Sequence, residues 1–187
     1  MEKKQKAGRI WERNLYTVLH DFIYILTAIT IVFVFFIRIV GVSGPSMQPT
    51  LQNGEYVVLR SSFLSDKYEP GDIVVATVPS YDASRPIVKR VIAVEGQTVD
   101  IDFTTGEVRV DQKLLEEPYL EEPTAANFDD GLEYPVKVPE GCVFLMGDNR
   151  NNSTDSRYAP IGCVDTDDVL GEVLLRVYPI NRIGGIK

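Results

Sequence analysis

The sequence predicts a mainly β domain that follows one N-terminal membrane-spanning helix. The first basis for this prediction is the segment 22–42, which is almost wholly apolar and about as long as a bilayer is thick. The second is the pattern beyond residue 50, where short β-branched runs alternate with turn signals such as Asn53-Gly54. No long helical period appears after the apolar segment.

Length and composition are those of a globular chain with room for one domain and an anchor. The 187 residues are 44% hydrophobic and 25% charged, which excludes an intrinsically disordered chain. The first 20 residues hold five basic and two acidic residues, a net charge of +3. Asp21 and Arg38 cancel. Because the whole chain has a net charge of −8, the remaining residues carry a net charge of −11. Because phosphate binding needs Lys and Arg, this acidic body predicts no nucleic-acid partner.

The apolar segment predicts a membrane anchor. Residues 22–37 carry no charge, and with residues 38–42 they make 21 residues, roughly 31 Å of helix. Arg38 lies near the far end, where its stem can extend toward the lipid headgroups. A cleaved signal peptide would have a shorter apolar core and an A-x-A site after it. A buried core helix would carry more polar residues than Thr27 and Thr30.

The charge asymmetry predicts the topology and the domain limits. By the positive-inside rule the basic tail, residues 1–21, stays cytoplasmic. Residues 22–42 form the transmembrane signal anchor of a single-pass protein of the cell membrane, and residues 43–187 form an extracytoplasmic β domain. Within that domain, residues at about 103–140 are acidic, rich in Pro and weakly patterned, so we expect an irregular inserted segment there.

The outer domain contains seven predicted strands. Each is short, β-branched and bounded by turn residues. They cover residues 55–59, 72–78, 87–94, 98–102, 107–110, 142–146 and 173–178.

The inventory of reactive side chains restricts the chemistry of the outer domain. The single histidine, His20, precedes the anchor, so a Ser-His-Asp triad and a histidine zinc site are both excluded there. We expect no metal and no cofactor. Cys142 and Cys163 fit a disulfide or two free thiols equally well. Acidic residues are too plentiful for a carboxylate pair to be excluded by counting.

A nucleophilic serine without histidine needs another base, and lysine is the usual one. A lysine amine is protonated at neutral pH unless burial lowers its pKa. Lys89 alone lies within a long apolar strand, and its same-face neighbours Ile87, Val91 and Ala93 are apolar. An edge-strand lysine that faces solvent is the alternative interpretation. Lys137 shows a similar alternation between two prolines, which indicate an edge strand.

The segment "MGDNRNNSTDSRY", residues 146–158, follows a predicted strand and is dense in opposite charges. A solvated loop is the simple interpretation. Bidentate pairs between its arginines and aspartates would hold such a loop rigid. A rigid loop could present Ser153 or Ser156 to a partner.

Four motifs together resemble bacterial type I signal peptidases. They are "GPSMQPTL", "PGDIVVATV", "VKRVIAVEGQTV" and "GDNRNNSTDSR", and they occur in the family's order behind a signal anchor. The resemblance extends from the anchor to about Val177. It implies a mostly antiparallel β catalytic domain, related in its core to LexA-like repressors, and the removal of signal peptides from secreted preproteins. With one membrane segment, the chain is similar to the shorter Gram-positive members.

The resemblance implies a role for each matching residue. Ser46 corresponds to the nucleophile and Lys89 to the general base. Ser153 corresponds to a serine whose hydroxyl orients the lysine amine. The remaining correspondences are ion pairs that support the dyad: Asp155 with Arg157, and Asp148 with Arg90.

The chain departs from some relatives at one position. Those relatives place a serine two residues before the nucleophile, where its hydroxyl contributes to the oxyanion hole. Here that position is Gly44. The oxyanion would then depend on the Ser46 backbone N–H, with the second donor open.

The expected substrate is the signal peptide of a secreted preprotein, with small residues at −1 and −3. It would bind as an extended strand, with Ile87 and Val88 as expected partners. Membrane lipid and proximity to the secretion translocon are also expected. Two alternatives remain: a non-catalytic membrane-anchored assembly factor of the same fold, or a specialised peptidase with one dedicated substrate.

Overall fold

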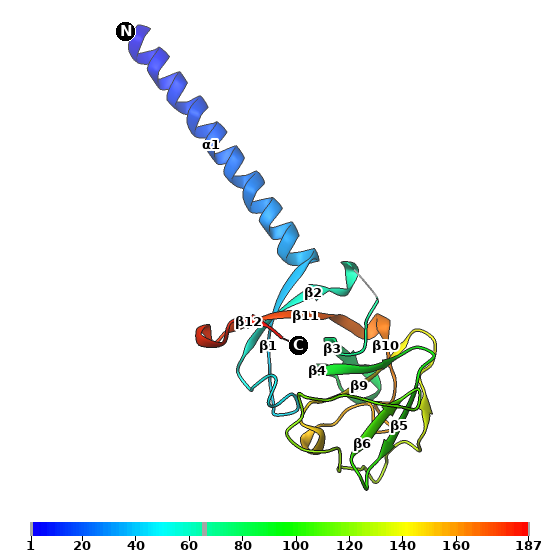
Figure 1. Cartoon of the computed structure of the whole chain (residues 1–187). Helices are drawn as coiled ribbons and strands as arrows, with labels where there is room; N and C mark the ends of the chain where they lie inside the picture. The colour runs from blue at the N-terminus through cyan, green and yellow to red at the C-terminus, as the bar shows by residue number, and fades with distance from the viewer. Residues whose placement is uncertain (1, 65–66, 187) are drawn as a thin grey trace. The chain divides into compact units, whose positions relative to one another are not determined.

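The computed structural model describes residues 2–64 and 67–186, and for residues 2–13 and Ala83 it describes the backbone alone. The chain divides into two compact units, Met1–Ile37 and Arg38–Lys187 (Figure 1). The first unit is helical and the second is built from β-strands.

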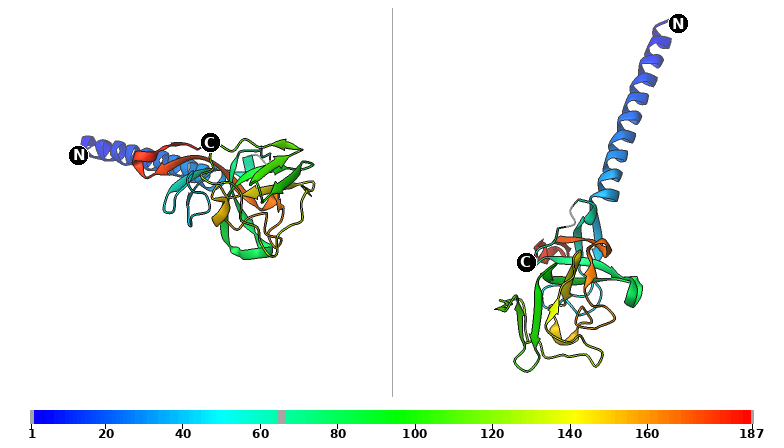
Figure 2. Two further views of the ribbon diagram at one scale, coloured as in Figure 1. Left: turned by 60° about the horizontal axis from the view of Figure 1, so that its bottom comes forward. Right: turned by 90° about the vertical axis from the view of Figure 1, so that its right-hand side faces the viewer.

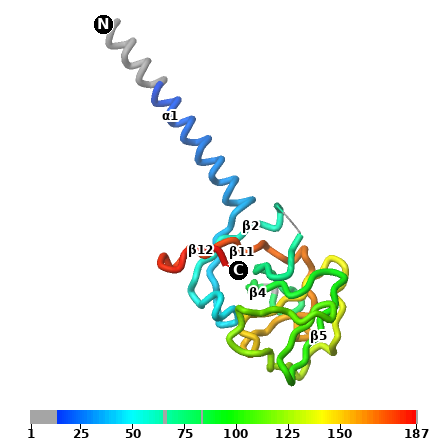
Figure 3. Tube along the Cα trace, in the orientation of Figure 1, coloured from blue at the N-terminus to red at the C-terminus, as the bar shows by residue number. Residues whose placement is uncertain are grey.

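A single helix, α1 (Glu2–Phe35), forms the first unit (Figure 3). Its part Asn14–Phe35, 22 residues with a mean hydropathy of 2.2, is long and apolar enough to cross a membrane. None of that stretch is buried within the protein. Its apolar side chains therefore have no protein core to pack against in the described part of the chain.

The helix ends earlier than the sequence predicts. We expected a helical anchor over residues 22–42, but residues after Phe35 leave the helix and Ile37–Gly41 form strand β1. The physical reason is local: Ile37, Ile39 and Val40 are β-branched and restrict χ1 in a helix, and Gly41 follows them. Hydropathy alone does not distinguish the last turn of an apolar helix from an apolar strand.

The larger sheet has eight strands in the order β1-β2-β11-β3-β4-β9-β10, with β12 beside β11. Its strand pairs from β2 to β10 are antiparallel, which confirms the predicted mainly β, antiparallel class. Beyond β1 the strands are β2 (Tyr56–Ser61), β3 (Ile73–Val78), β4 (Ala83–Val94), β9 (Cys142–Met146), β10 (Val164–Asp165), β11 (Val169–Tyr178) and β12 (Gly184–Gly185). A short helix, α2 (Pro79–Asp82), joins β3 to β4. Four 3-10 helices complete the domain: η1 (Ser62–Leu64), η2 (Arg150–Asn152), η3 (Thr166–Asp168) and η4 (Ile180–Arg182).

A second sheet has the order β7-β6-β5-β8, and its strands β5, β6 and β7 are drawn in green (Figure 2). Its strands are β5 (Thr98–Asp102), β6 (Glu107–Val110), β7 (Lys113–Leu114) and β8 (Val136–Lys137). The expected irregular insertion at about 103–140 is therefore partly regular, because β6, β7 and β8 lie inside it. The long connection between β7 and β8 is the irregular part.

Three clusters of buried apolar side chains hold the domain together. One joins the two sheets, since Phe144 of β9 packs with Val99 of β5 and Val108 of β6. Another contains Met47 and Leu51, which are 1% and 0% exposed. These two residues fix the turn after β1 to the larger sheet.

Candidate active site

The turn that carries Ser46 is fixed on both sides. Before it, the Val42 N–H donates to the Glu55 carbonyl at 2.8 Å. After it, the side chains of Met47 and Leu51 are buried in the core. Burial of two large side chains close to Ser46 restricts where its hydroxyl can lie.

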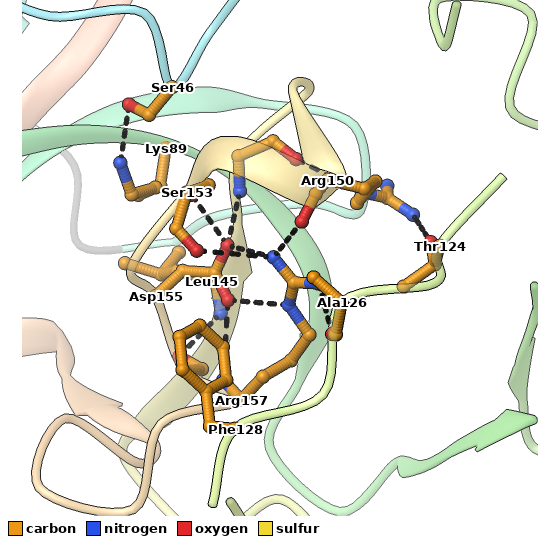
Figure 4. Close-up of polar contacts among 12 residues, drawn as sticks. Ser46, Lys89, Thr124, Ala126, Phe128, Leu145, Arg150, Ser153, Asp155 and Arg157 are labelled. Carbon is orange, nitrogen blue, oxygen red and sulfur yellow. Dashed lines mark hydrogen bonds and ion pairs between the residues drawn. The ribbon is translucent and has the colours of Figure 1, made fainter. Parts of the chain in front are cut away.

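Lys89 reaches this serine from β4. Strand β3 flanks it, with Lys89 opposite Val74, and the lysine is only 3% exposed. Its Nζ lies 2.7 Å from the Ser46 Oγ, within hydrogen-bonding distance (Figure 4). The lysine that the strand pattern selects is therefore buried and in contact with the serine.

Burial changes the acidity of this lysine. Desolvation of the ammonium lowers the pKa of Lys89 from 10.5 to about 8, although the nearby Asp155 carboxylate opposes that change. At pH 7 about one lysine in ten is then neutral, against fewer than about one in a thousand at the ordinary value. The amine can therefore act as a base near neutral pH.

Ser153 lies near the lysine but is bonded elsewhere. Its hydroxyl donates to Asp155 Oδ2 at 2.7 Å, and among the described residues no hydrogen bond joins it to Lys89 (Figure 4). Ser153 is 8% exposed. The structure thus places the expected orienting serine in the site, with its hydroxyl directed at the aspartate.

Asp155 and Arg157 form a fully buried pair. Arg157 Nε and Nη2 donate to the two carboxylate oxygens at 2.8 and 2.9 Å, and the Gly147 N–H adds a third bond at 2.9 Å. Burial alone would raise the pKa of Asp155, but the hydrogen bonds and charge of Arg157 lower it. The carboxylate therefore stays ionised and accepts the hydrogen bond that the Ser153 hydroxyl donates.

The other expected pair, Arg90 with Asp148, also lies in the buried site. Arg90 Nε and Nη2 donate to Asp148 at 2.8 and 2.7 Å, and both side chains are almost completely buried. Thr50 donates to the same carboxylate. The pair ties the strand of Lys89 to the loop that carries Ser153.

Gly147 is a site residue that the sequence analysis did not identify. A Cβ at this position would overlap the Ser153 side chain and the Ser46 carbonyl oxygen. The absence of a side chain therefore allows the nucleophile turn and the loop to meet. Its place directly after a buried strand was the available signal, but a glycine there also fits an ordinary turn.

Arg150 and Asn149 add contacts that the sequence analysis did not assign. The Asn149 N–H donates to the Ser46 carbonyl at 2.9 Å, and its side chain donates to the Pro45 carbonyl. Arg150 is 2% exposed and donates from Nε to the Gly147 carbonyl at 3.0 Å. The charge density of the loop predicted rigidity, but it did not indicate these partners.

The backbone donors next to Ser46 are few. The Gly44 N–H already donates to Asn53 Oδ1 at 3.0 Å, and Pro45 has no N–H. Among the described hydrogen bonds, none uses the Ser46 N–H as donor. It is therefore the one backbone donor of residues 44–46 that remains available to a substrate oxygen.

A groove of about 680 Å³ contains Ser46 and Lys89. The expected substrate partners Ile87 and Val88 line it, together with residues of β1. β4 pairs with β9 only from Arg90 onward, and β1 is the last strand of its sheet. Two strand edges without partners in the described sheet therefore flank the groove.

The two cysteines and a possible metal site are the remaining points raised by the sequence. Cys142 and Cys163 are free thiols. Among the residues whose side chains the structure describes, no group of three or more His, Cys, Asp or Glu is placed to hold a metal ion.

Comparisons with known proteins identify one family. The profile of the family described as "Signal peptidase, peptidase S26" matches residues 15–178. A "Probable signal peptidase I-1" of Synechocystis sp. is 37% identical over 150 residues, covering 76% of this chain and 72% of that protein. "Signal peptidase I U" of Bacillus subtilis is 32% identical, covering 78% of each. A "Signal peptidase I" of Streptococcus pneumoniae is 31% identical, covering 87% of this chain and 93% of that protein.

Among solved structures, a signal peptidase I from Enterococcus faecalis V583 covers 57% of this chain and 96% of that chain, at 28% identity and a TM-score of 0.46. The profile match spans most of the sequence and includes Ser46, Lys89 and the loop of Ser153. The chain therefore belongs to the type I signal peptidase family, peptidase S26, and is a serine endopeptidase of that family.

Proposed function

We propose that this protein removes N-terminal signal peptides from secreted preproteins, with Ser46 as nucleophile and Lys89 as general base. The observation that carries the proposal is the 2.7 Å contact between Lys89 Nζ and Ser46 Oγ, made by a lysine that is 3% exposed. Family membership supports the reaction, since the curated relatives are named as signal peptidases. The buried amine supports the choice of base.

The chemistry follows from the two side chains. Neutral Lys89 accepts the Ser46 proton as the serine oxygen attacks the carbonyl carbon of residue −1. The tetrahedral intermediate collapses to an acyl-enzyme, and the lysine ammonium gives its proton to the departing amine. Water, deprotonated by the again neutral lysine, then hydrolyses the ester and releases the signal peptide.

The Ser46 N–H is our candidate for the oxyanion donor. It is the remaining free backbone donor of residues 44–46, and Gly44 supplies no hydroxyl. A donor aimed at the developing oxyanion typically contributes about 3 kcal/mol to the transition state.

The other predicted site residues hold the catalytic serine and lysine in position. Ser153 is bonded to Asp155, and Arg157 holds the aspartate in place. The pair of Arg90 and Asp148 fixes the strand of Lys89 against the same loop. In this proposal none of these groups exchanges a proton with the substrate.

The substrate would add a strand between the open edges of β1 and β4. Extended chains place residues −1 and −3 on one face. In the groove that face would meet β-branched walls that include Val40, Val75 and Val88, and in this proposal these walls select against a large side chain. Small residues at −1 and −3 follow from this fit, with the backbone of Ile87 and Val88 as hydrogen-bonding partners.

The membrane assignment rests on α1. An apolar helix of sufficient length and a basic start favour a single-pass anchor with a cytoplasmic N-terminus and an extracytoplasmic catalytic domain. Lipid then surrounds the helix, and substrates arrive near the translocon as their signal peptides enter the bilayer.

The test is cleavage of a preprotein with an Ala-x-Ala site by the purified full chain. Ser46→Ala and Lys89→Ala should each abolish cleavage, whereas Lys137→Ala, an exposed lysine of β8, should cleave at the wild-type rate. Substantial cleavage by Ser46→Ala or Lys89→Ala would overturn the dyad. A wild-type chain that cleaves no preprotein would favour the non-catalytic assembly factor, and one that accepts a single preprotein would favour the dedicated peptidase.

A further inference from the structure

The connection between β7 and β8 packs along the loop of the active site. We call residues 115–132 of this connection the strap. The strap leaves the smaller sheet and contacts residues 147–158 of the loop at several points. Three of its residues, Thr124, Ala126 and Phe128, are drawn beside Arg150 and Arg157 in Figure 4.

The first contact neutralises a buried cation. Arg150 is 2% exposed, and its Nη2 forms an ion pair with Glu117 of the strap. Its Nη1 donates to the hydroxyl of Thr124, also in the strap, at 3.0 Å. The third nitrogen of the guanidinium, Nε, donates to the Gly147 carbonyl. The strap therefore supplies both the counter-charge and a hydrogen-bond acceptor to the arginine that holds Gly147.

A second contact joins side chains of the loop to the backbone of the strap. The Asn151 side-chain oxygen accepts the N–H groups of Ala125 and Ala126, each at 3.0 Å. The carbonyl of Ala126 in turn accepts a bond from Arg157 at 3.2 Å. These bonds keep the strap at a fixed distance from the Asp155–Arg157 pair.

A third contact reaches the strand of the base. The ring of Tyr119 lies 3.9 Å from the Arg90 guanidinium carbon, a cation–π contact. Arg90 is the neighbour of Lys89 in β4 and is bonded to Asp148. The strap thus contacts two buried arginines, Arg150 of the loop and Arg90 beside Lys89.

These contacts converge on the reacting groups through Gly147. Gly147 is bonded to Arg150 and Asp155, and it lies against Ser153 and the Ser46 carbonyl. A displacement of Arg150 would therefore move the nucleophile turn and the loop together. In catalysis, a misplacement of about 1 Å can cost about 100-fold in rate.

We propose that the strap is a positioning element of the active site and that Glu117 and Tyr119 are its positioning residues. Glu117 holds Arg150 and so fixes Gly147, while Tyr119 holds Arg90 and so fixes the strand of Lys89. Neither residue takes part in proton transfer. This inference rests on the proposed function, because it assigns a role relative to the pair of Ser46 and Lys89.

The first test replaces the counter-charge without changing shape. In the full chain, Glu117→Gln should lower kcat at least about tenfold and leave KM within about twofold, because substrate-binding edges are untouched. Glu116→Gln, the exposed neighbour without a described ion pair, is the matched control and should keep wild-type kcat. Rates are measured well below the thermal midpoint of each variant. A Glu117 that only stabilises the fold would lower that midpoint and leave kcat unchanged, which would overturn the proposal.

A double-mutant cycle tests the route through Arg150. The kcat of Glu117→Gln with Arg150→Gln should equal that of Arg150→Gln alone, because the glutamate acts through the arginine. Multiplicative losses would overturn this route. For the second residue, Tyr119→Phe keeps the ring over Arg90 but loses the hydroxyl that donates to Glu117 at 3.2 Å, so it should lower kcat less than Tyr119→Leu, which loses the ring as well. If Glu117→Gln does not fold, this pair carries the test, and equal kcat in Phe and Leu variants overturns the proposal.

Ser46→Ala in the same assay separates the two proposals. An inactive Ser46→Ala beside a fully active Glu117→Gln overturns the strap alone. An active Ser46→Ala overturns the dyad, and it also overturns the positioning role of the strap, which depends on the dyad.

Discussion

Lys89 combines a buried position with a single polar contact. Among the described residues no ion pair involves its amine, and the one hydrogen bond of its side chain goes to Ser46. Without a bonded carboxylate, desolvation is the main influence and the pKa of the amine falls to about 8. A charged partner at bonding distance would have favoured the ammonium form and abolished its use as a base.

This pKa predicts how activity depends on pH. Because neutral Lys89 is the reactive form, kcat/KM should rise with pH and level off above about 8, and at pH 6 it should be about 100-fold below the plateau. The measurement is a pH–rate profile with a peptide substrate that has no titratable group near the cleavage site. A flat profile between pH 6 and 9 would argue against Lys89 as the base.

Gly147 gives a second prediction. A methyl group at this position would overlap Ser153 and the Ser46 carbonyl, so Gly147→Ala should reduce kcat by about 100-fold through displacement of the nucleophile turn. Gly184→Ala is the control, since a Cβ there meets no atom within 4 Å. Equal activity of the two variants would show that the close approach at Gly147 is not needed.

At the scale of elements, the sequence predicted several strands accurately but not the end of α1 or the strap. The runs 98–102, 107–110 and 142–146 are strands with those bounds, because turn residues delimit them on both sides. The end of α1 was wrong, since an apolar β-branched segment satisfies both a helix and a strand pattern. The strap was not predicted, because its order comes from contacts with Arg150 and Arg157 that are distant in sequence.

The valines of β3 and β4 that line the groove lead to a prediction about substrate preference. Val75 of β3 and Val88 of β4 are direct cross-strand neighbours, and both line the groove. Val88→Ala should widen it and raise the kcat/KM of a peptide with Val at −3, relative to Ala at −3, by about tenfold. Val99→Ala, in the buried cluster that joins the two sheets, is the control for general destabilisation and should leave the ratio unchanged.

An unchanged ratio in Val88→Ala would contradict the placement of the substrate along β4. The same pair of peptides, measured with the wild-type chain, gives the reference preference. Because the ratio compares two substrates on one enzyme, a partial loss of folded protein cancels.

At the scale of the whole molecule, charge and hydropathy divide the chain into the same two parts as the fold, although the sequence places the boundary after residue 42 and the fold places it after Ile37. The basic residues lie at the start of α1, the apolar stretch follows, and the acidic body is the second unit. The division could be predicted because both properties are summed over many residues. The pairing of Lys89 with Ser46, 43 positions apart, could not follow from such sums and was predicted from the strand pattern and the family motifs.

The orientation in the membrane is the prediction that belongs to this scale. With a tag at the N-terminus, protease added to intact spheroplasts should digest the body and spare the tag, and inverted vesicles should give the opposite result. Replacement of Lys3, Lys4 and Lys6 by Glu reverses the charge of the first 20 residues from +3 to −3 and should mix the two orientations. Replacement of the same lysines by Arg keeps the charge and should keep the orientation. A wild-type body digested only in inverted vesicles would place the catalytic domain in the cytoplasm, where an enzyme that acts on secreted preproteins would not meet the exported cleavage site.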